Sequence, residues 1–136
     1  MRPLQLLTAA TVLAAAGQAC AADALPPGRV AAGAAVFQQC AACHAAGPGA
    51  QNGVGPALNG VVGRSAGSAP GYRYSSAMRG SGLTWDRATL GRFLGSPAEV
   101  VPGTRMGFAG LSSPQDRADV IAYLQQFAAD GRPSGK

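Results

Sequence analysis

The 136-residue chain is short of the residues from which most catalytic and metal sites are built. It contains one His and six Asp plus Glu residues, too few for a conventional acid–base site or for a zinc site made only of side chains. Large apolar side chains are also scarce, because the chain has four Phe, three Tyr and one Trp, and much of its 47% hydrophobic content is Ala. A chain of this length forms one domain at most, and its side chains alone would make a thin core. We therefore expect a group other than a side chain to fill its centre.

The first 22 residues have the pattern of a signal peptide. Arg2 gives a basic start, residues 6–16 form an apolar stretch, and Ala19-Cys20-Ala21 fits the small-residue cleavage site. The apolar stretch is too short for a transmembrane span. In an alternative, Cys20 is lipidated and retained, because the residues before it faintly resemble a lipoprotein box.

Removal of residues 1–22 would leave two of the three cysteines and take one positive charge from the formal net charge of +5. We predict a single domain over residues 23–130, followed by a flexible tail over residues 131–136. We also predict a periplasmic location and no integral membrane span.

Residues 40–44 read Cys40-Ala41-Ala42-Cys43-His44, the C-x-x-C-H pattern through which c-type haem is attached. On a helical turn, two cysteines three positions apart lie on one side and can each bond one haem vinyl group, while the adjacent His reaches the iron. Three alternative chemistries fit the pattern less well. A thioredoxin-like pair would follow a strand, and no strand-like run precedes Cys40. A disulfide leaves His44 without a role, and a zinc site needs two further ligands that the mature chain lacks.

His44 is the only His of the chain, so it is the candidate for one axial position of the haem iron. The thioether candidates for the other position are Met106 and Met78. Met106 follows Pro102 and Gly103, which hold the backbone in a loop that can face the haem from the side opposite His44. Met78 lies in a stretch typical of one helical turn, where a Met usually fills the core. We favour Met106 as the ligand.

Further short motifs stand around these residues, namely Gly55-Pro56, Gly63-Arg64, Pro70-Gly71-Tyr72, Leu83-Thr84-Trp85, Pro97, Pro102-Gly103-Thr104 and Ile121-Ala122-Tyr123-Leu124. Together with Cys40, Cys43, His44 and Met106, they make the chain resemble the class I cytochromes c from Gly33 to about Phe127. The resemblance implies an all-α fold with about four helices and long loops wrapped around one haem. It also implies that this haem c is attached covalently through Cys40 and Cys43.

The same resemblance implies roles for the other matched residues. Pro56 would offer its backbone carbonyl to the second nitrogen of His44 and so fix the tautomer of that ligand. A buried haem propionate needs hydrogen-bond donors. Arg64, Tyr74 and Trp85 match the family positions that provide them, and Tyr72 lies on the same loop. Without the family context, ordinary packing would explain the aromatic residues and solvation would explain Arg64.

Three positions depart from the family pattern. Phe93 stands about thirteen residues before Met106, where the family often has a Tyr hydrogen-bonded near the Met sulfur. We therefore expect an altered iron–sulfur bond and an altered potential. Met78 occupies a position where mitochondrial members carry an Asn. Arg105 replaces the usual Lys before the ligand, and Lys136 is the only Lys of the chain.

The hydrophobic pattern predicts helices over residues 31–42, 86–94 and 113–128, one helical turn over residues 75–80, and loops over residues 44–74. Gly33 is small enough to let another helix cross closely. Thr84 or Trp85 would open the second long helix, and Pro97 would keep it from continuing. Ser113 would cap the last helix, with a proline in its first turn.

Binding of both His44 and Met106 would leave the iron no open position, so we predict an electron carrier and not an enzyme. Its partners would be a donor and an acceptor protein that dock transiently at the haem edge. The net positive charge favours acidic partner surfaces, with Arg73, Arg79 and Arg105 as candidate docking residues. We expect a monomer and no nucleic-acid binding.

Two other functions stay open at this point. If Met106 is not bound, the open sixth position would suit a haem enzyme or a gas sensor. The same site would also suit a subunit of a larger periplasmic oxidoreductase, because nothing in the sequence separates a free carrier from a fixed one.

Overall fold

The computed structural model describes residues 24–135, so the predicted signal peptide, Cys20 and Lys136 lie outside the described residues. The helices of the described part are α1 (Val30–Phe37), α2 (Ser76–Arg79), α3 (Arg87–Gly95), α4 (Pro97–Val100) and α5 (Pro114–Gln125). Within these residues, β pairing is limited to two isolated bridges, Ser65 with Thr84 and Phe127 with Pro133. The predicted all-α class is confirmed. Between residues 24 and 135, no helix is long and apolar enough to cross a bilayer.

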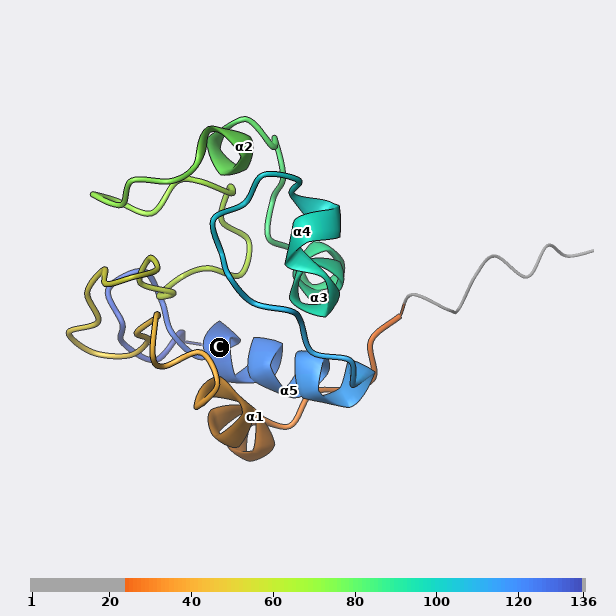
Figure 1. Ribbon diagram of the computed structural model, residues 1–136. Helices are drawn as coiled ribbons and strands as arrows, with labels where there is room; N and C mark the ends of the chain where they lie inside the picture. Colours follow the sequence, from red (N-terminus) through yellow and green to blue (C-terminus); the bar gives the residue numbers. More distant parts are fainter. Residues whose placement is uncertain (1–23, 136) are drawn as a thin grey trace, which may run out of the picture.

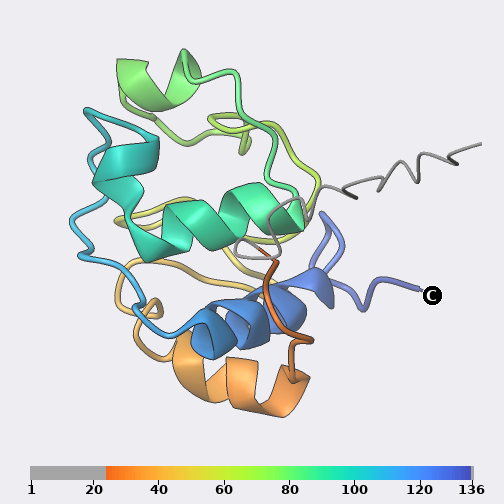
Figure 2. The same ribbon diagram turned by 90° about the vertical axis from the view of Figure 1, so that its right-hand side faces the viewer.

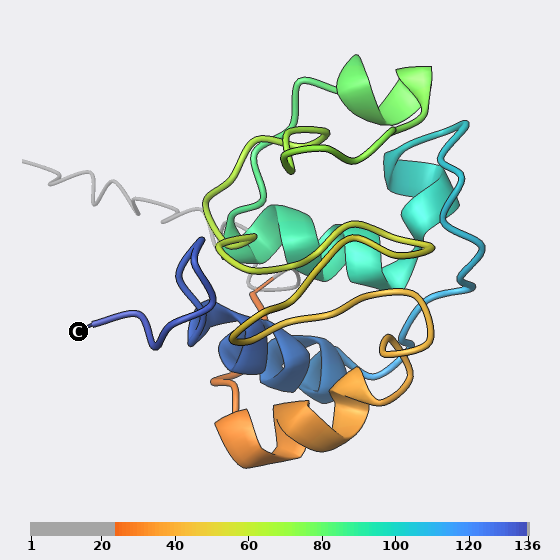
Figure 3. The ribbon, with the colours of Figure 1, turned by 90° about the vertical axis from the view of Figure 1, so that its left-hand side faces the viewer.

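The helices form one part of the molecule and the long loops form the other. α1 and α5 lie side by side, and α3 lies next to α5 with α4 continuing from it (Figure 1). Figure 2 shows these helices one above another, with α2 at the end far from α1. From the opposite side, the loops that join α1 to α2 pass in front of α3 (Figure 3). The largest buried apolar side chains come from both parts: Phe37, Val61, Met78, Trp85, Leu90, Phe93, Leu94, Val101, Leu111, Val120, Ile121 and Leu124.

Two glycines allow the start of the domain to pack directly on α5. A Cβ atom on Gly33 would lie 1.9 Å from the carbonyl oxygen of Asp119, and one on Gly28 would lie 2.2 Å from that of Ala118. No larger residue fits at either place without moving the backbone. The prediction that Gly33 permits a close helix crossing is confirmed.

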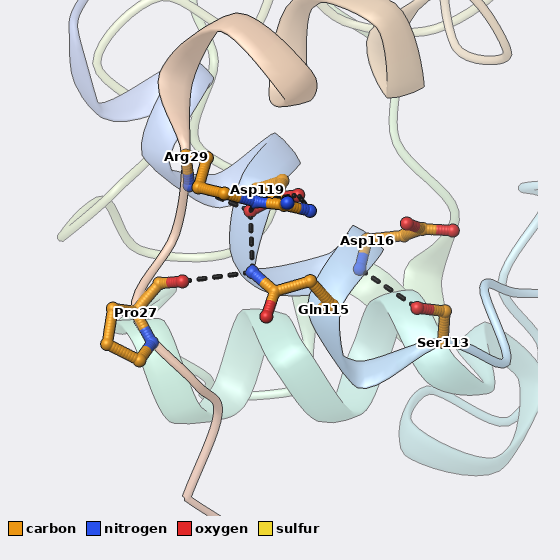
Figure 4. Close-up of polar contacts among 6 residues, drawn as sticks. All are labelled: Pro27, Arg29, Ser113, Gln115, Asp116 and Asp119. Carbon is orange, nitrogen blue, oxygen red and sulfur yellow. Dashed lines mark hydrogen bonds and ion pairs between the residues drawn. The ribbon is translucent and has the colours of Figure 1, made fainter.

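Side-chain caps fix where the two longer later helices begin. The Ser113 hydroxyl accepts a hydrogen bond from the Asp116 N–H at 3.1 Å (Figure 4), as predicted for the last helix. α3 is capped by Asp86, which replaces the predicted Thr84 or Trp85. Its carboxylate accepts from the third N–H of the helix at 2.7 Å, and this hydrogen bond lowers the pKa of Asp86. A carboxylate at this end is also favoured by the helix dipole.

Other boundaries differ from those predicted. The first helix ends at Phe37, and residues 38–43 continue as turns in which the His44 N–H donates to the Cys40 carbonyl at 2.9 Å. Pro97 begins the short helix α4, because a helix can start on a proline whose missing N–H would have had no partner. The last helix ends at Gln125, three residues earlier than predicted.

The predicted tail begins with a fold-back onto the end of α5. The Ser134 N–H donates to the Gln126 carbonyl at 2.6 Å, and the Ala128 N–H donates to the Arg132 carbonyl at 2.9 Å. The backbone turns at Gly131, whose φ of +79° favours glycine. These contacts attach the first part of the tail to the domain.

A buried carboxylate joins the start of the domain to α5. Asp119 is 1% exposed, and its Oδ2 lies 2.6 Å from Nη2 of Arg29, whose side chain is 65% exposed. Its Oδ1 accepts from the Arg29 backbone N–H at 2.7 Å and from Nε2 of Gln115 at 2.8 Å (Figure 4). The Gln115 amide also donates to the Pro27 carbonyl. These contacts, the Arg29 side chain first, lower the pKa of Asp119 to about 2.

This pKa makes the folding stability depend on pH in acid. Because the pKa of Asp119 falls from 3.8 to about 2 on folding, the unfolded chain binds more protons between these values, and stability falls as the pH drops through them. Asp119→Asn should therefore lower the thermal midpoint at neutral pH. Its difference from the wild type should narrow as the pH decreases from about 4 to about 2, as measured by circular dichroism.

Asp130→Asn provides the matched control. It removes the ion pair with Arg132, in which the side chains are 48% and 81% exposed, and a pair so exposed contributes little. Equal losses in the two variants, or an Asp119→Asn difference that does not vary with pH, would contradict the argument.

Candidate functional site

One cavity lies between the helices and the loops and contains the predicted site. Its lining includes the apolar side chains of Val61, Leu90, Phe93, Leu94 and Leu124. The structure brings to it every residue that the sequence singled out: Cys40, Cys43, His44, Pro56, Arg64, Tyr72, Tyr74, Trp85 and Met106. These residues are spread between positions 40 and 106 of the chain, so the fold collects separate motifs at one place.

His44 is held in one orientation by the loop that follows it. Its Nδ1 lies 2.7 Å from the Pro56 carbonyl oxygen. A carbonyl can only accept a hydrogen bond, so Nδ1 carries the proton and Nε2 keeps its lone pair. Gly55 lies flat against the ring, because a Cβ there would be 2.5 Å from Cε1 of His44. The Gly55 N–H also donates to the Cys43 carbonyl at 2.8 Å. Imidazole and loop are therefore fixed to each other.

The two cysteines lie on successive turns beside His44. Cys40 is partly buried and Cys43 is exposed, and no disulfide joins them. Burial raises the pKa of the Cys40 thiol, and the neighbouring Cys43 adds to this shift. Both sulfur atoms remain free for other covalent bonds.

Asn52 and Tyr72 connect the loop that follows His44 with the loop around Pro70. Asn52 was not predicted as a functional residue, and Tyr72 was predicted only to lie on the loop of the propionate donors. The Asn52 side chain accepts from the Ala57 N–H and donates to the Pro70 carbonyl, both at 2.9 Å. The Tyr72 hydroxyl donates to the Val54 carbonyl at 2.6 Å, so its proton is already used there. An Asn in a Gly- and Pro-rich segment commonly makes such backbone contacts, and this composition was the one local signal for Asn52.

The predicted donors Arg64, Tyr74 and Trp85 line the cavity and differ in whether they already donate a hydrogen bond. The Arg64 guanidinium donates to the Asn59 carbonyl at 2.9 Å. The Tyr74 oxygen accepts from the Ala69 N–H at 3.1 Å. Trp85 is 6% exposed, and within residues 24–135 its indole N–H and the Tyr74 O–H donate no hydrogen bond. These two donors are therefore available to an acceptor in the cavity.

Both candidate methionines reach the cavity. Met106 is partly buried in the segment between α4 and α5, and its N–H donates to the Thr104 hydroxyl at 3.3 Å. Met78 lies on α2 and is 8% exposed. Phe93 packs against Trp85 with 4.8 Å between ring centroids, so the wall beside them carries no hydroxyl at this position.

The residues present fit a c-type haem. A ring nitrogen with a free lone pair, two thiols and two thioethers line one cavity whose wall is mostly apolar. The unused donors of Tyr74 and Trp85 suit the acidic groups of a porphyrin that would otherwise be buried without partners. The set combines nitrogen and sulfur ligands of the kind that bind haem iron in carriers of electrons.

Comparisons with known proteins agree with this interpretation of the cavity. The family model described as cytochrome c matches residues 30–128. The chain is 63% identical to cytochrome c2 of Rhodomicrobium vannielii over 89 residues, which cover 65% of this chain and 71% of that protein. It is 57% identical to cytochrome c2 of Rhodoblastus acidophilus over 100 residues, which cover 74% and 94%. The solved structure of cytochrome c2 from Rhodospirillum centenum has a TM-score of 0.71 and 40% identity, covering 74% of this chain and 99% of that one.

The contact between Gly55 and His44 gives a direct test of the site geometry. Gly55→Ala places a methyl group 2.5 Å from Cε1 of His44, so the ring must move away from the Pro56 carbonyl. We expect a loss of about 1–3 kcal/mol in the free energy of unfolding of the purified protein, as for other overpacked sites.

Gly53→Ala is the control, because its Cβ would meet only the Cys43 carbonyl oxygen at 3.6 Å, an ordinary contact. It should change the stability by less than about 1 kcal/mol. Urea unfolding of both variants checks the comparison, and similar values for the two would show that Gly55 does not constrain His44.

Proposed function

The chain belongs to the cytochrome c family, and from this premise we propose that it is an exported electron carrier whose haem iron is bound by His44 and Met106. The family carries one covalently attached haem c, and Cys40 and Cys43 stand at the required spacing before His44. The observation that carries the proposal is the cavity itself, which is lined by both cysteines, both proposed ligands and an apolar wall.

The haem, when bound, supplies an iron that gains and loses one electron without making or breaking substrate bonds. Around it, His44 presents Nε2 while Pro56 holds the opposite nitrogen at 2.7 Å. Met106, which also lines the cavity, would offer a soft thioether. With two protein ligands in place, no position is left for a substrate, and we propose no catalytic activity.

The rest of the lining would hold the group and keep water away from it. Trp85 and Tyr74 would donate to its acidic substituents, since their protons have no partner within the described residues. Leu90, Phe93 and Leu94 are each 8% exposed or less and close the wall beside α3. A dry wall lowers the local dielectric constant, so the charge of the iron site is stabilised mainly by the fixed ligands.

Arginines mark the proposed docking face for redox partners. Arg73, Arg79 and Arg105 are exposed, and Arg105 also lines the cavity. The Arg105 guanidinium donates to the Arg73 carbonyl, and that of Arg79 donates to the Tyr74 carbonyl at 2.6 Å. Residues 24–85 contain no Asp or Glu. The ion pairs of the described residues are Arg29–Asp119 and Arg132–Asp130, so none of these three arginines is paired there, and their charges favour an acidic partner surface.

The export part of the proposal rests on residues 1–22, which have the pattern of a signal peptide. Removal of this segment would place the carrier in the periplasm, where it would meet donor and acceptor proteins as a monomer. N-terminal sequencing of the mature protein tests this part, because a chain that begins at Ala22 or Asp23 agrees with it and one that begins at Cys20 favours the lipidated alternative.

The methionine variants test the ligand assignment. Met106→Ala should abolish the thioether-to-iron absorption band of the ferric protein, because it removes the sulfur. The potential should fall by on the order of 100 mV, within the range of about 0.8 V over which axial ligands set haem potentials. Optical spectra and a redox titration measure both effects.

Met78→Ala is the matched control and should keep the band. If the band survives in Met106→Ala and disappears in Met78→Ala, the ligand is Met78. Rapid binding of carbon monoxide by the reduced wild-type protein at neutral pH would contradict the electron-carrier proposal, because it would reveal an open sixth position.

The docking face is tested by a pair of double variants with equal charge change. Arg79→Gln with Arg105→Gln should slow electron exchange with an acidic redox partner about tenfold at low ionic strength, the lower end of electrostatic steering effects. The difference should shrink at high salt, where the charges are screened.

Arg92→Gln with Arg132→Gln is the control, since neither residue lines the cavity or contacts the three docking arginines, and their side chains bond to Thr89 and Asp130 instead. Stopped-flow rates over a salt series provide the measurement. Equal slowing by both pairs would assign the effect to net charge and not to this face.

A further inference from the structure

The segment that carries Met106 has few attachments to the rest of the protein. It runs from residue 101 to residue 113, between α4 and α5. Within the described residues, and apart from the α5 cap at Ser113, one backbone hydrogen bond joins its second half to a helix, from the Leu111 N–H to the Leu94 carbonyl at 2.7 Å. Gly110 lies against the end of α3, because a Cβ there would be 2.1 Å from the Gly95 carbonyl oxygen. The segment therefore depends on what holds its end near Leu111.

Arg117 supplies a second attachment at the same place. Its Nη1 donates to the Leu111 carbonyl at 2.6 Å and to the Ser112 carbonyl at 3.1 Å. Its Nε is buried and has no hydrogen-bond partner within residues 24–135. No carboxylate of the described residues forms an ion pair with this guanidinium. Its partners are thus the backbone carbonyls of the Met106 segment.

The position of Arg117 is unfavourable for α5 alone. It lies in the first turn of the helix, where the dipole disfavours a positive charge, and its buried Nε lacks a partner at a further cost. The end of α3 offers compensation, because Nη1 would lie 3.3 Å from a Cβ on Gly95, next to the negative end of that helix dipole. An arginine here is best explained by the three elements that meet around it.

We propose that Arg117 is a positioning residue that holds the end of the Met106 segment against α3 and α5 and so keeps the thioether at the haem. The inference rests on the proposed function, in which Met106 is the ligand. Met106 is five residues from Leu111, and Arg117 fixes that end with hydrogen bonds from a charged group, which are stronger than neutral ones. Without them, residues 107–112 would separate from the helices more readily, and the state with Met106 away from the iron would be more populated.

The test compares two arginines that hold backbone carbonyls in different places. Arg117→Gln removes the charged donor from the Met106 segment. Arg87→Gln removes a similar contact elsewhere, because Nη2 of Arg87 donates to the Pro26 carbonyl of the N-terminal segment. For each haem-loaded protein, one measures the affinity of the ferric form for imidazole, the strength of the thioether band and the urea midpoint.

Arg117→Gln should bind imidazole about tenfold more tightly than the wild type, which corresponds to about 1.4 kcal/mol, with a weaker thioether band. Arg117→Lys keeps the charge and a donor and should show a rise of about two- to threefold. Arg87→Gln should leave the imidazole affinity unchanged, even if it lowers the urea midpoint as much as Arg117→Gln does. Because Arg117→Lys retains most of the contact, its imidazole affinity provides the test if Arg117→Gln loses its haem.

Equal imidazole affinities of the Arg117→Gln and Arg87→Gln proteins would overturn the inference, as would an unchanged affinity in Arg117→Lys if the Gln variant does not hold haem. Failure of the proposed function looks different. In that case the wild type lacks the thioether band, or Met106→Ala retains it, whatever Arg117 does.

Discussion

The fold depends on a cavity that its own side chains do not fill. Trp85, Leu90, Phe93 and Leu94 form an apolar wall, and the loops between α1 and α2 close the other side. The buried apolar cluster to which both parts contribute therefore surrounds the cavity and does not fill it. Away from the cavity, the start of the domain is joined to α5 through the close crossing at Gly33 and the buried carboxylate of Asp119. A haem in the centre would supply the missing apolar contact, and without it the wall would face water.

Features that depend on residues a few positions apart could be predicted from the sequence, whereas features that depend on contacts between distant segments could not. The cap at Ser113 and the haem pattern at residues 40–44 depend on neighbours a few positions apart, so the sequence reveals them directly. The Asn52 contact with the Pro70 carbonyl joins two loops 18 positions apart, and the Gly- and Pro-rich composition around Asn52 favours backbone contacts without specifying that partner. Pro97 was ambiguous because a proline can end one helix and also begin the next.

His44 is held by more contacts with the surrounding chain than Met106 is. On the His44 side, the Pro56 carbonyl and the close approach of Gly55 fix the ring, and Asn52 holds the neighbouring backbone at Ala57. On the Met106 side, the Met106 N–H donates to the Thr104 hydroxyl and its carbonyl accepts from the Phe108 N–H, both within the same segment. The Met106 sulfur accepts no hydrogen bond from the described residues. The thioether must therefore be kept in place by the segment as a whole. This makes the ends of that segment, rather than its middle, the points where the bond to iron is controlled.

Arginine side chains both hold the loops in place and give the surface its positive charge. Within residues 24–135, five guanidinium groups donate to backbone carbonyls of loops or segments, those of Arg64, Arg79, Arg87, Arg105 and Arg117. A carboxylate in the same role would cancel the charge, but a carbonyl satisfies the N–H groups and leaves the formal charge intact. A chain with six acidic residues can thus fasten its long loops and still present a positive surface. Lysine would do this less well, because a planar guanidinium can reach two carbonyls at once, as Arg117 does with Leu111 and Ser112. The contacts that order the loops around the haem cavity therefore also preserve the field that would bring a partner to it.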